Sequence, residues 1–579
     1  MQLAVDLHSA RTKECDTSEL RRPADTERVP WPATFPRSRP AAPSSEAGHC
    51  YEGGESLESK GRLRSWDVLA AVGGETVRYG EFMAQEHFDV LVVGAGISGI
   101  AAGYHLQTEC PDRSYAILER RDRIGGTWDL FRYPGIRSDS DMYTLGYRFR
   151  PWTNPEAIAA GPSILKYVEE TASENGIDGR IRYGHHVKNA SWSSRESRWS
   201  VETVRTDTGQ VARYTCNFLF MCSGYYDYDK GYTPDFAGTE NFRGRIVHPQ
   251  KWTDDIDYDD KRVVVIGSGA TAITLVPEMA KRAKHVTMLQ RSPTYVVSAP
   301  EQDAMANGLR KRLPDWLVYS LVRWRNVIIG ALFFWFCRRY PDKAKGFLLR
   351  RVREELGEDY DVDQHFTPRY NPWQERMCLV PNGDLFESLK SGETSVVTDH
   401  IETFTEKGIR LESGKELEAD LVVTATGLNL QLLGGLELMV DGERVDPAKS
   451  FTYKGVMFSD IPNLALAVGY TNASWTLKCD LTCEYVCRLL NHMKRNGYEK
   501  CWPTPDNSDL EPHPLMDFTS GYIQRSIDQF PKQAENAPWK SYQNYLLDIW
   551  TVAYGSIDGE GLNFSRGMAA PSVSSKSSA

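Results

Sequence analysis

Two glycine-rich stretches, 173 positions apart, hold residues whose types and spacing could bind a dinucleotide. They are Gly94-Ala95-Gly96-Ile97-Ser98-Gly99 and Gly267-Ser268-Gly269-Ala270-Thr271-Ala272. In such a fingerprint the glycines allow a tight turn and let the backbone approach a pyrophosphate, which lies at the N-terminus of the following helix. Two sites in one chain predict two cofactors that meet, and the chemistry they indicate is hydride transfer from a nicotinamide to a flavin.

The sequence around the first fingerprint supplies the elements that this motif requires. Residues 88–93 form an apolar, β-branched run that predicts a buried parallel strand, and residues 100–106 predict the helix after the turn. A second strand is predicted over 115–118 and ends at Glu119, 25 positions after Gly94. A carboxylate at that place suits a ribose that carries no phosphate, as in FAD or NAD.

The second fingerprint lies between strands predicted over 262–266 and 285–289. The later strand is followed by Arg291 and Ser292, where an acid stands in the first unit. Because arginine pairs well with phosphate, a guanidinium and a hydroxyl at this place favour a ribose 2′-phosphate. We therefore expect the second site to bind NADPH rather than NADH; the alternative is that Arg291 is a solvated charge at a strand end.

Further motifs resemble those of a known enzyme family. The linker ahead of the second fingerprint holds Phe242, Gly244, His248 and Trp252, and the loop after Glu119 holds Gly126, Trp128, Tyr133, Pro134, Gly135 and Asp139. With these residues at this spacing, the chain resembles the class B flavoprotein monooxygenases, the Baeyer–Villiger class, from about Phe88 to Phe564. Within that class it is most similar to the mycobacterial group that activates ethionamide, over 131–152, 263–297 and 468–476.

The resemblance implies a fold and a reaction. The fold is an α/β arrangement of two interleaved Rossmann-like dinucleotide-binding domains, for FAD and NADP, with a helical insertion. In the implied reaction NADPH reduces FAD, the reduced flavin activates O2, and one oxygen atom is inserted beside a ketone carbonyl to give an ester or lactone. The expected partners are O2 and small apolar ketones, with sulfides and thioamide prodrugs open to the same oxygenating chemistry.

The resemblance also implies which residues form the site. Arg376 matches the active-site arginine of the class, and Asp139 matches the carboxylate that positions it; a structural ion pair is the alternative. An oxygen anion in a desolvated site needs a cation that stays protonated, which favours arginine. Glu375 stands where the class usually has a lysine that helps to bind the 2′-phosphate, which leaves more of that task to Arg291 and Ser292.

The remaining assignments follow from the same motifs. The residues assigned to FAD are Gly94, Gly96, Ser98, Gly99, Glu119, Gly126, Thr127, Trp128, Asp139 and Val187, and those assigned to NADPH are Gly267, Gly269, Ala270, Thr271, Arg291 and Ser292. Phe242, Gly244, His248 and Trp252 are assigned to the coupling of domain rotation to cofactor position. In that role His248 is a hydrogen-bonded strut and not a catalytic base.

At 579 residues the chain is too long for one core, so we expect several domains. Residues 1–83 are rich in Pro, Arg, Ser and Glu and are expected to be disordered or to precede the true start at Met83. The other expected segments are 84–238 and 395–565 for the FAD domain, 239–299 and 366–394 for the NADP domain, 300–365 for the helical insertion and 566–579 for a mobile tail. A strand within 420–427 is expected to return the chain to the FAD domain.

Charge and cysteine usage narrow the function further. The net charge of −10 and the lack of a long basic stripe give no reason to expect a nucleic-acid partner. The eleven cysteines include no CxxC pair, and we expect no disulfide framework, no metal site and a reducing, cytoplasmic location. Cys479, Cys483 and Cys487 share one helical face and are expected to be buried small apolar residues.

Residues 326–337 form an apolar stretch that is flanked by arginines. It is shorter than the roughly 20 residues that a helix needs to cross a bilayer. We favour a core helix of the insertion, and the alternative is a peripheral membrane contact or an apolar entrance for substrate. An oligomer is compatible with the sequence.

Three rival functions share the dinucleotide sites. A flavin disulfide reductase needs a redox cysteine pair beside the flavin, and the loop 125–135 holds no cysteine. A monooxygenase that hydroxylates nitrogen or oxygenates sulfur would use the same cofactors on a different substrate. A non-catalytic redox sensor would not need Arg376 and Asp139, and their presence argues against it.

Overall fold

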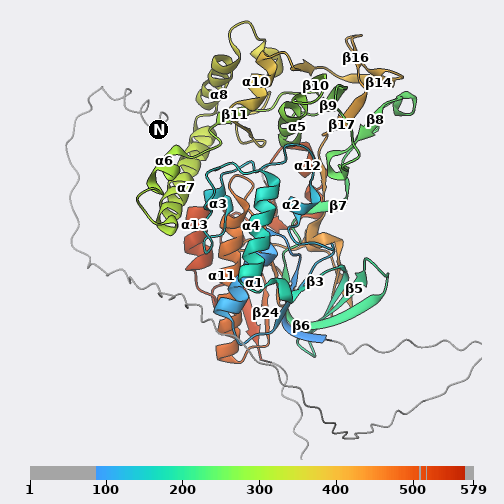
Figure 1. Ribbon diagram of the computed structural model, residues 1–579. Coiled ribbons are helices and arrows are strands. Elements are labelled where there is room, and N and C mark those ends of the chain that lie inside the picture. The colour runs from blue at the N-terminus through green and yellow to red at the C-terminus, as the bar shows by residue number, and fades with distance from the viewer. Residues whose placement is uncertain (1–85, 507–509, 517, 567–579) are drawn as a thin grey trace, which may run out of the picture. The chain divides into compact units, whose positions relative to one another are not determined.

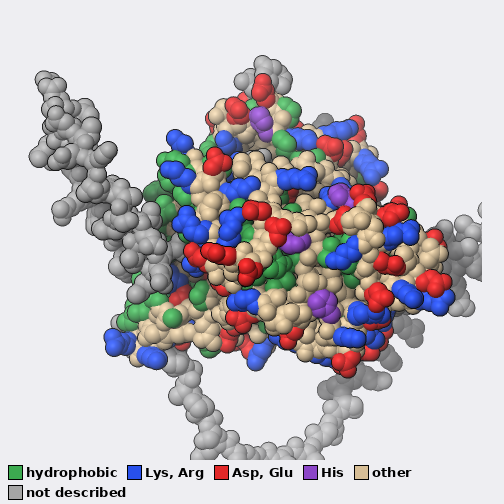
Figure 2. All heavy atoms as spheres, turned by 90° about the horizontal axis from the view of Figure 1, so that it is seen from above, with side chains coloured by type: hydrophobic (Ala, Val, Ile, Leu, Met, Phe, Trp, Pro, Cys, Tyr) green, Lys and Arg blue, Asp and Glu red, His purple; other side chains and the backbone are tan. Residues whose placement is uncertain are grey.

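The computed structural model describes residues 86–506, 510–516 and 518–566. Two sheets in this part of the chain carry the parallel strands that precede the two fingerprints (Figure 1). The fold is therefore α/β with two Rossmann-like units, as predicted. On the face seen in Figure 2, Lys and Arg side chains alternate with Asp and Glu, and no basic stripe gathers on that face.

The first sheet is built around β1 (Glu86–Val93), which pairs in parallel with β2 and β6. Its strand order is β20 (Glu443–Val445), β19 (Glu437–Val440), β4 (His185–Ser193), β5 (Arg198–Arg205), β6 (Val211–Met221), β1, β2 (Tyr115–Leu118) and β3 (Ile181–Arg182), and β23 (Leu464–Leu466) also pairs with β6. Val90 and Val92 of β1 face one apolar core, while Leu91 and Val93 face another. Both faces of the strand are thus buried, which explains its unbroken apolar run.

Helices cover the first core of this sheet. α1 (Ile97–Glu109) packs along α11 (Trp475–Asn496), and α4 (Gly161–Glu174) joins the same core. Two short helices, α2 (Thr127–Leu130) and α3 (Met142–Leu145), lie in the loop region that follows Glu119. α2 contacts α4, and α3 contacts α11 and α7 (Asp315–Arg339), so this loop region is held against helices.

The second sheet is entirely parallel. Its order is β13 (Thr394–Thr398), β10 (His285–Gln290), β9 (Arg262–Ile266), β17 (Leu421–Thr424) and β8 (Arg245–Val247). α5 (Ala270–Ala280) follows β9 and packs against α10 (Asp384–Lys390). Side chains of β9 alternate between two cores, which again accounts for a strand without polar alternation.

The assignment of β17 corrects one prediction. The strand within 420–427 was expected to return the chain to the first domain, but β17 pairs with β9 and β8 in the second sheet. β10 occupies only one edge of β9, and β17 fills the other edge. Residues 394–398 and 421–424 therefore belong to the second sheet, and a separate three-stranded sheet of β14 (Ile401–Thr405), β15 (Gly408–Leu411) and β16 (Glu416–Glu418) lies between them in sequence. The chain rejoins the first sheet at β19. The other boundaries stay predictions; 1–83 lies outside the described residues, as does all of 566–579 except Arg566.

Helices dominate the segment that was predicted to be a helical insertion. They are α6 (Ala304–Leu309), α7 (Asp315–Arg339), α8 (Pro341–Leu356) and α9 (Val362–His365). The apolar stretch 326–337 lies within α7, and among its residues only Val327 and Cys337 are fully buried. The prediction of a core helix is therefore correct for one edge of α7, while the rest of the helix surface is not buried.

Candidate cofactor and substrate site

A cavity of about 320 Å³ is lined by residues of both dinucleotide-binding units. Its walls include Gly94, Gly96, Ser98, Glu119, Gly126, Thr127, Trp128, Asp139, Val187, Ala270, Thr271 and Arg376. These residues come from the first fingerprint, the end of β2, the loop that follows it, β4, the second fingerprint and the segment before β12 (Cys378–Pro381). Residues predicted for two different cofactors thus face one space.

The first fingerprint has the backbone geometry that a pyrophosphate site requires. Gly94 has φ +105°, and a Cβ on Gly99 would lie 1.8 Å from the carbonyl oxygen of Gly94. Gly99 itself does not line the cavity, and its role is the close packing of α1 on the turn. α1 begins after Gly96 with no side-chain cap, which leaves its first N–H groups available for an anion.

Glu119 lies at the end of β2, and its carboxylate is buried. Oε2 accepts a hydrogen bond from the Ala95 N–H at 2.7 Å, and Oε1 accepts one from the Arg121 N–H at 2.8 Å. Burial raises the pKa of Glu119, and these two N–H groups oppose that rise. A carboxylate fixed beside the glycine turn, with acceptor capacity left toward the cavity, fits the ribose of a dinucleotide.

Arg376 and Asp139 meet within the cavity wall. Nη2 of Arg376 lies 2.9 Å from Oδ2 of Asp139, and each side chain is about one-third exposed. The Asp139 carboxylate raises the pKa of the Arg376 guanidinium above its already high value, against the opposing effect of burial. The guanidinium is therefore a permanent cation, paired on one side and facing the cavity.

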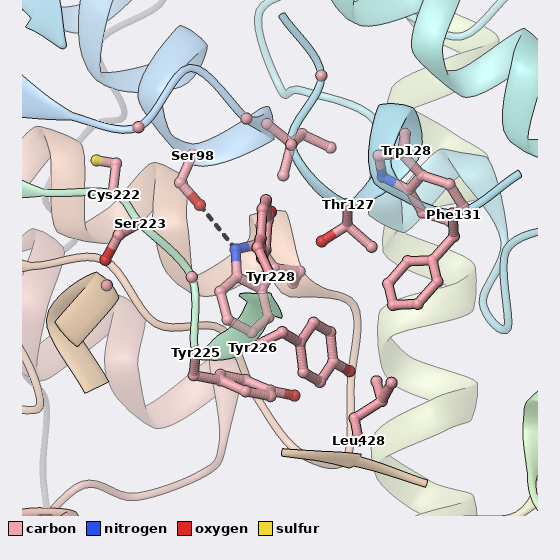
Figure 3. Close-up of a pocket in the computed structure, with 18 of the residues that line it drawn as sticks. Ser98, Thr127, Trp128, Phe131, Cys222, Ser223, Tyr225, Tyr226, Tyr228 and Leu428 are labelled. Carbon is pink, nitrogen blue, oxygen red and sulfur yellow. Dashed lines mark hydrogen bonds between the residues drawn. The ribbon is translucent and has the colours of Figure 1, made fainter. Parts of the chain in front are cut away.

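An aromatic wall surrounds this pair, and sequence reasoning missed most of it. Tyr225 and Tyr226 contact each other edge to face, with ring centroids 4.7 Å apart. The ring centroid of Trp475 lies 5.2 Å from that of Tyr225. The Trp475 indole donates a hydrogen bond to Ser98 Oγ at 2.7 Å, the dashed line in Figure 3. Figure 3 also shows Tyr225 and Tyr226 on the same side of the cavity as Leu428. The available signal was a run of tyrosines after Gly224, at the carboxyl end of a sheet strand.

The second fingerprint opens onto the surface beside the cavity. α5 begins after Gly269 with no side-chain cap, and no atom lies within 4 Å of the position that a Cβ on Gly269 would occupy. Ser268 Oγ donates a 2.8 Å hydrogen bond to the carbonyl oxygen of Ser292, which holds the strand end beside the fingerprint. Gly267, Gly269, Arg291 and Ser292 do not line the cavity itself.

Glu375 lies close enough to Arg291 for their charges to interact. Burial raises the pKa of Glu375, and the positive charge of Arg291 opposes this rise. The position that usually carries a lysine in the class thus places an acid next to the residue predicted to bind a 2′-phosphate. An ionised Glu375 would repel that phosphate.

The linker residues lie outside the cavity, and their contacts are with the second unit. Nδ1 of His248 accepts a hydrogen bond from the Gln250 N–H, and Nε2–H donates to the carbonyl oxygen of Gly427 at 3.1 Å. Burial lowers the pKa of His248, so its ring is neutral with both nitrogens engaged. Phe242 is buried near Phe404, Gly244 precedes β8, and Trp252 packs near Tyr258. The role of His248 as a strut that couples domain rotation to cofactor position stays a prediction.

The nine cysteines in the described part of the chain are buried. Cys479, Cys483 and Cys487 are buried on α11, as predicted, and burial raises the pKa of the Cys479 thiol to about 12. Among the described residues that line the cavity, Cys222 is the one cysteine. The cavity wall, within the described chain, therefore offers no cysteine pair of the kind that a disulfide reductase needs.

Two Rossmann-like units that share one cavity define a two-dinucleotide oxidoreductase. Residues 157–313 match the family described as flavin-binding monooxygenase-like, and residues 92–154 match the NAD(P)-binding Rossmann-like domain. The chain is 56% identical over 482 residues to the FAD-containing monooxygenase EthA of Mycobacterium tuberculosis, covering 83% of this chain and 98% of the relative. It is 52% identical over 491 residues to EthA of Mycolicibacterium smegmatis, covering 85% and 99%.

A solved structure shares the fold. An oxidised steroid monooxygenase bound to NADP matches with a TM-score of 0.66 and 22% identity, over 83% of this chain and 100% of that one. The chain belongs to the family of FAD-containing monooxygenases, within the class B flavoprotein monooxygenases.

Proposed function

We propose that the chain binds FAD at the first fingerprint and NADPH at the second, and that it inserts one atom of O2 beside the carbonyl of small apolar ketones. Sulfides and thioamides are the second substrate class of the same proposal, because sulfur accepts oxygen from the same reagent. The observation that carries the proposal is the Arg376–Asp139 pair, 2.9 Å apart, in a cavity lined by residues of both fingerprints.

The residues of the first fingerprint bind within the cavity, and those of the second fingerprint bind at the surface beside it. The free N–H groups at the start of α1 and the Glu119 carboxylate hold pyrophosphate and ribose of FAD. The start of α5 holds the pyrophosphate of NADPH, and Arg291 with Ser292 binds its 2′-phosphate. When bound, FAD reduced by NADPH supplies the activation of O2.

The remaining residues stabilise negative charge on oxygen and limit the access of water. Arg376 stabilises negative charge that develops on oxygen, and Asp139 fixes the orientation of its guanidinium. Tyr225, Tyr226 and Trp475 form an aromatic wall that limits access of water to this cation. Their apolar faces favour substrates without charge.

A panel of aliphatic ketones, aryl ketones, sulfides, thioamides and amines tests the proposal, with the product mass as the readout. We expect one added oxygen atom on ketones and on sulfur compounds, and a dependence on FAD and NADPH. Oxidation of NADPH that yields only hydrogen peroxide with every compound would contradict the proposal. Products from amines alone would instead assign the chain to nitrogen hydroxylation.

A further inference from the structure

One face of α7 exposes large apolar side chains to solvent. The helix buries a single edge, which includes Val318, Val322 and Val327. The rest of the helix surface exposes large apolar side chains, each between 46% and 60% exposed. They are Trp316, Trp324, Ile329, Leu332 and Trp335. α7 is also the one helix in the described chain that is long and apolar enough, by length and composition, to cross a membrane.

A second segment extends this apolar face. In α13 (Tyr545–Asp548) and the π-helical turn Ile549–Ala553 that follows it, Leu547 and Trp550 are 46% and 72% exposed. The ring of Tyr545 lies 6.2 Å from that of Trp324, so the two segments adjoin. Figure 1 places α13 beside α7, and hydrophobic side chains gather at the left edge of Figure 2. We call these exposed residues of α7 and α13 the tryptophan face.

The ends of α7 carry positive charge, although the chain as a whole is acidic. Residues 310–315 and 338–345, at the two ends of α7, hold seven Lys and Arg against two acids, while the net charge of the chain is −10. Lys311 and Arg312 are exposed before the helix begins, and Arg339 and Lys343 are exposed where it ends. Basic residues at both ends of a tryptophan-rich apolar surface are typical of segments that lie in the headgroup region of an anionic membrane.

The buried edge of α7 prevents the helix from leaving the protein. Arg323 is 5% exposed and donates hydrogen bonds to the carbonyl oxygens of Tyr143 at 2.8 Å and Gly146 at 2.9 Å. Its Nη2 also lies 3.6 Å from a carboxylate oxygen of Asp480. Withdrawing the helix would leave these groups buried without partners, which is costly. The helix is therefore suited to lie on a bilayer and not to cross it.

We propose that the tryptophan face binds the surface of an anionic phospholipid bilayer, with α7 parallel to the membrane plane. A second copy of the chain is a poorer occupant. In a two-fold symmetric pair the positive ends of one α7 would face positive ends of the other, whether the helices run parallel or antiparallel. The negative charge of anionic lipid headgroups complements the positive charge at both ends of α7. This proposal is independent of the reaction proposed above.

Flotation of the full FAD-loaded chain with lipid vesicles tests the proposal. We expect the protein to float with vesicles of phosphatidylcholine and phosphatidylglycerol, and to float less at high salt or with phosphatidylcholine alone. Ile329→Asp with Leu332→Asp should lower the partition coefficient by at least about a hundredfold, because each removes an inserted apolar side chain. Arg312→Glu with Arg339→Glu should lower it on anionic vesicles by roughly twentyfold.

The matched control is Val211→Asp, a residue of β6 that is 53% exposed and lies outside the tryptophan face. This variant should float like the parent chain. The FAD content and unfolding temperature of every variant should match those of the parent, since all the changed side chains are exposed. Failure of the parent chain to float with anionic vesicles would overturn the proposal, as would unchanged flotation of the Ile329/Leu332 variant. A concentration-dependent dimer that those two changes abolish, without any lipid binding, would assign the face to a second copy.

Discussion

At the scale of single residues, the proposed chemistry depends on charges held in fixed places. Asp139 keeps Arg376 oriented and protonated, and Glu119 is fixed by two backbone N–H groups beside the glycine turn. In the second site, by contrast, the acid Glu375 lies close to Arg291, and its negative charge opposes the binding of a phosphate.

Replacing Arg376 tests its proposed role. Arg376→Ala should retain FAD and still oxidise NADPH, but the rate of ketone oxygenation should fall by about 10²- to 10³-fold, since a charge-stabilising group is lost. Arg376→Lys should recover only part of the rate, because an ammonium cannot pair with Asp139 as a planar guanidinium does. Product formation is followed by mass, and Arg410→Ala, at an exposed ion pair with Glu402, is the control. An unchanged ketone rate in Arg376→Ala would remove this residue from the reaction.

Changes at Arg291 and Glu375 should act in opposite directions on NADPH. Arg291→Ala should raise KM for NADPH by roughly ten- to a hundredfold, with little change for NADH, because a charged hydrogen bond to phosphate contributes about 1.5–3 kcal/mol. Comparable effects on both nucleotides would mean that the 2′-phosphate is recognised elsewhere.

Glu375→Gln should lower KM for NADPH and also change its pH dependence. Because burial raises the pKa of Glu375, its carboxyl loses its proton at a higher pH than usual. In the parent chain KM for NADPH should therefore rise as the pH increases through that pKa, and the glutamine variant should lack this rise. NADH, which has no 2′-phosphate, serves as the control for general pH effects. A pH profile that is identical in both proteins would contradict this account.

At the scale of elements, a buried ion pair fixes the segment that borders the cavity. Nζ of Lys478 on α11 lies 2.8 Å from Oδ2 of Asp548 on α13, and both side chains are at most 3% exposed. The Tyr470 hydroxyl donates to the same oxygen at 2.6 Å, and Tyr470 lines the cavity. The end of α13 is thereby tied to α11 through Lys478 and to the chain just before α11 through Tyr470.

Removing one partner of this pair should destabilise the protein strongly. Asp548→Ala leaves the buried Lys478 ammonium without its counter-charge, with the Lys454 carbonyl oxygen at 3.4 Å as an acceptor, and removes the acceptor of the Tyr470 hydroxyl. We expect a loss of about 3–5 kcal/mol in the free energy of unfolding. Chemical denaturation followed by tryptophan fluorescence measures this loss. Glu437→Ala breaks the exposed pair with Arg444 and should cost less than about 1 kcal/mol. Equal losses in the two variants would show that the buried pair does not anchor the segment.

The elements that sequence predicts well are those with strong local signals. The strands over 115–118 and 262–266 have the predicted bounds, because apolar runs end at a glycine turn or at a charged residue. The strand within 420–427 was assigned to the wrong sheet, because the sequence of a short apolar strand does not indicate which strands pair with it. The aromatic wall was missed for a related reason. Tyr225 and Trp475 meet only through the folding of distant loops.

At the scale of the molecule, the two units are arranged so that their fingerprints serve one cavity. Ala270 and Thr271 of the second unit share its lining with Gly96 and Ser98 of the first. His248 links the linker to Gly427, just after β17. Two separate nucleotide sites would bind cofactors independently, whereas a shared cavity allows one to reduce the other.

Anaerobic mixing of the purified, FAD-loaded chain with NADPH tests this central claim most directly. We predict that the visible absorption of the flavin bleaches in proportion to the NADPH added, and that admission of O2 with a ketone present restores it as the oxygenated product forms. A protein that is colourless and does not take up added FAD would contradict the account, and so would bound flavin that NADPH does not bleach.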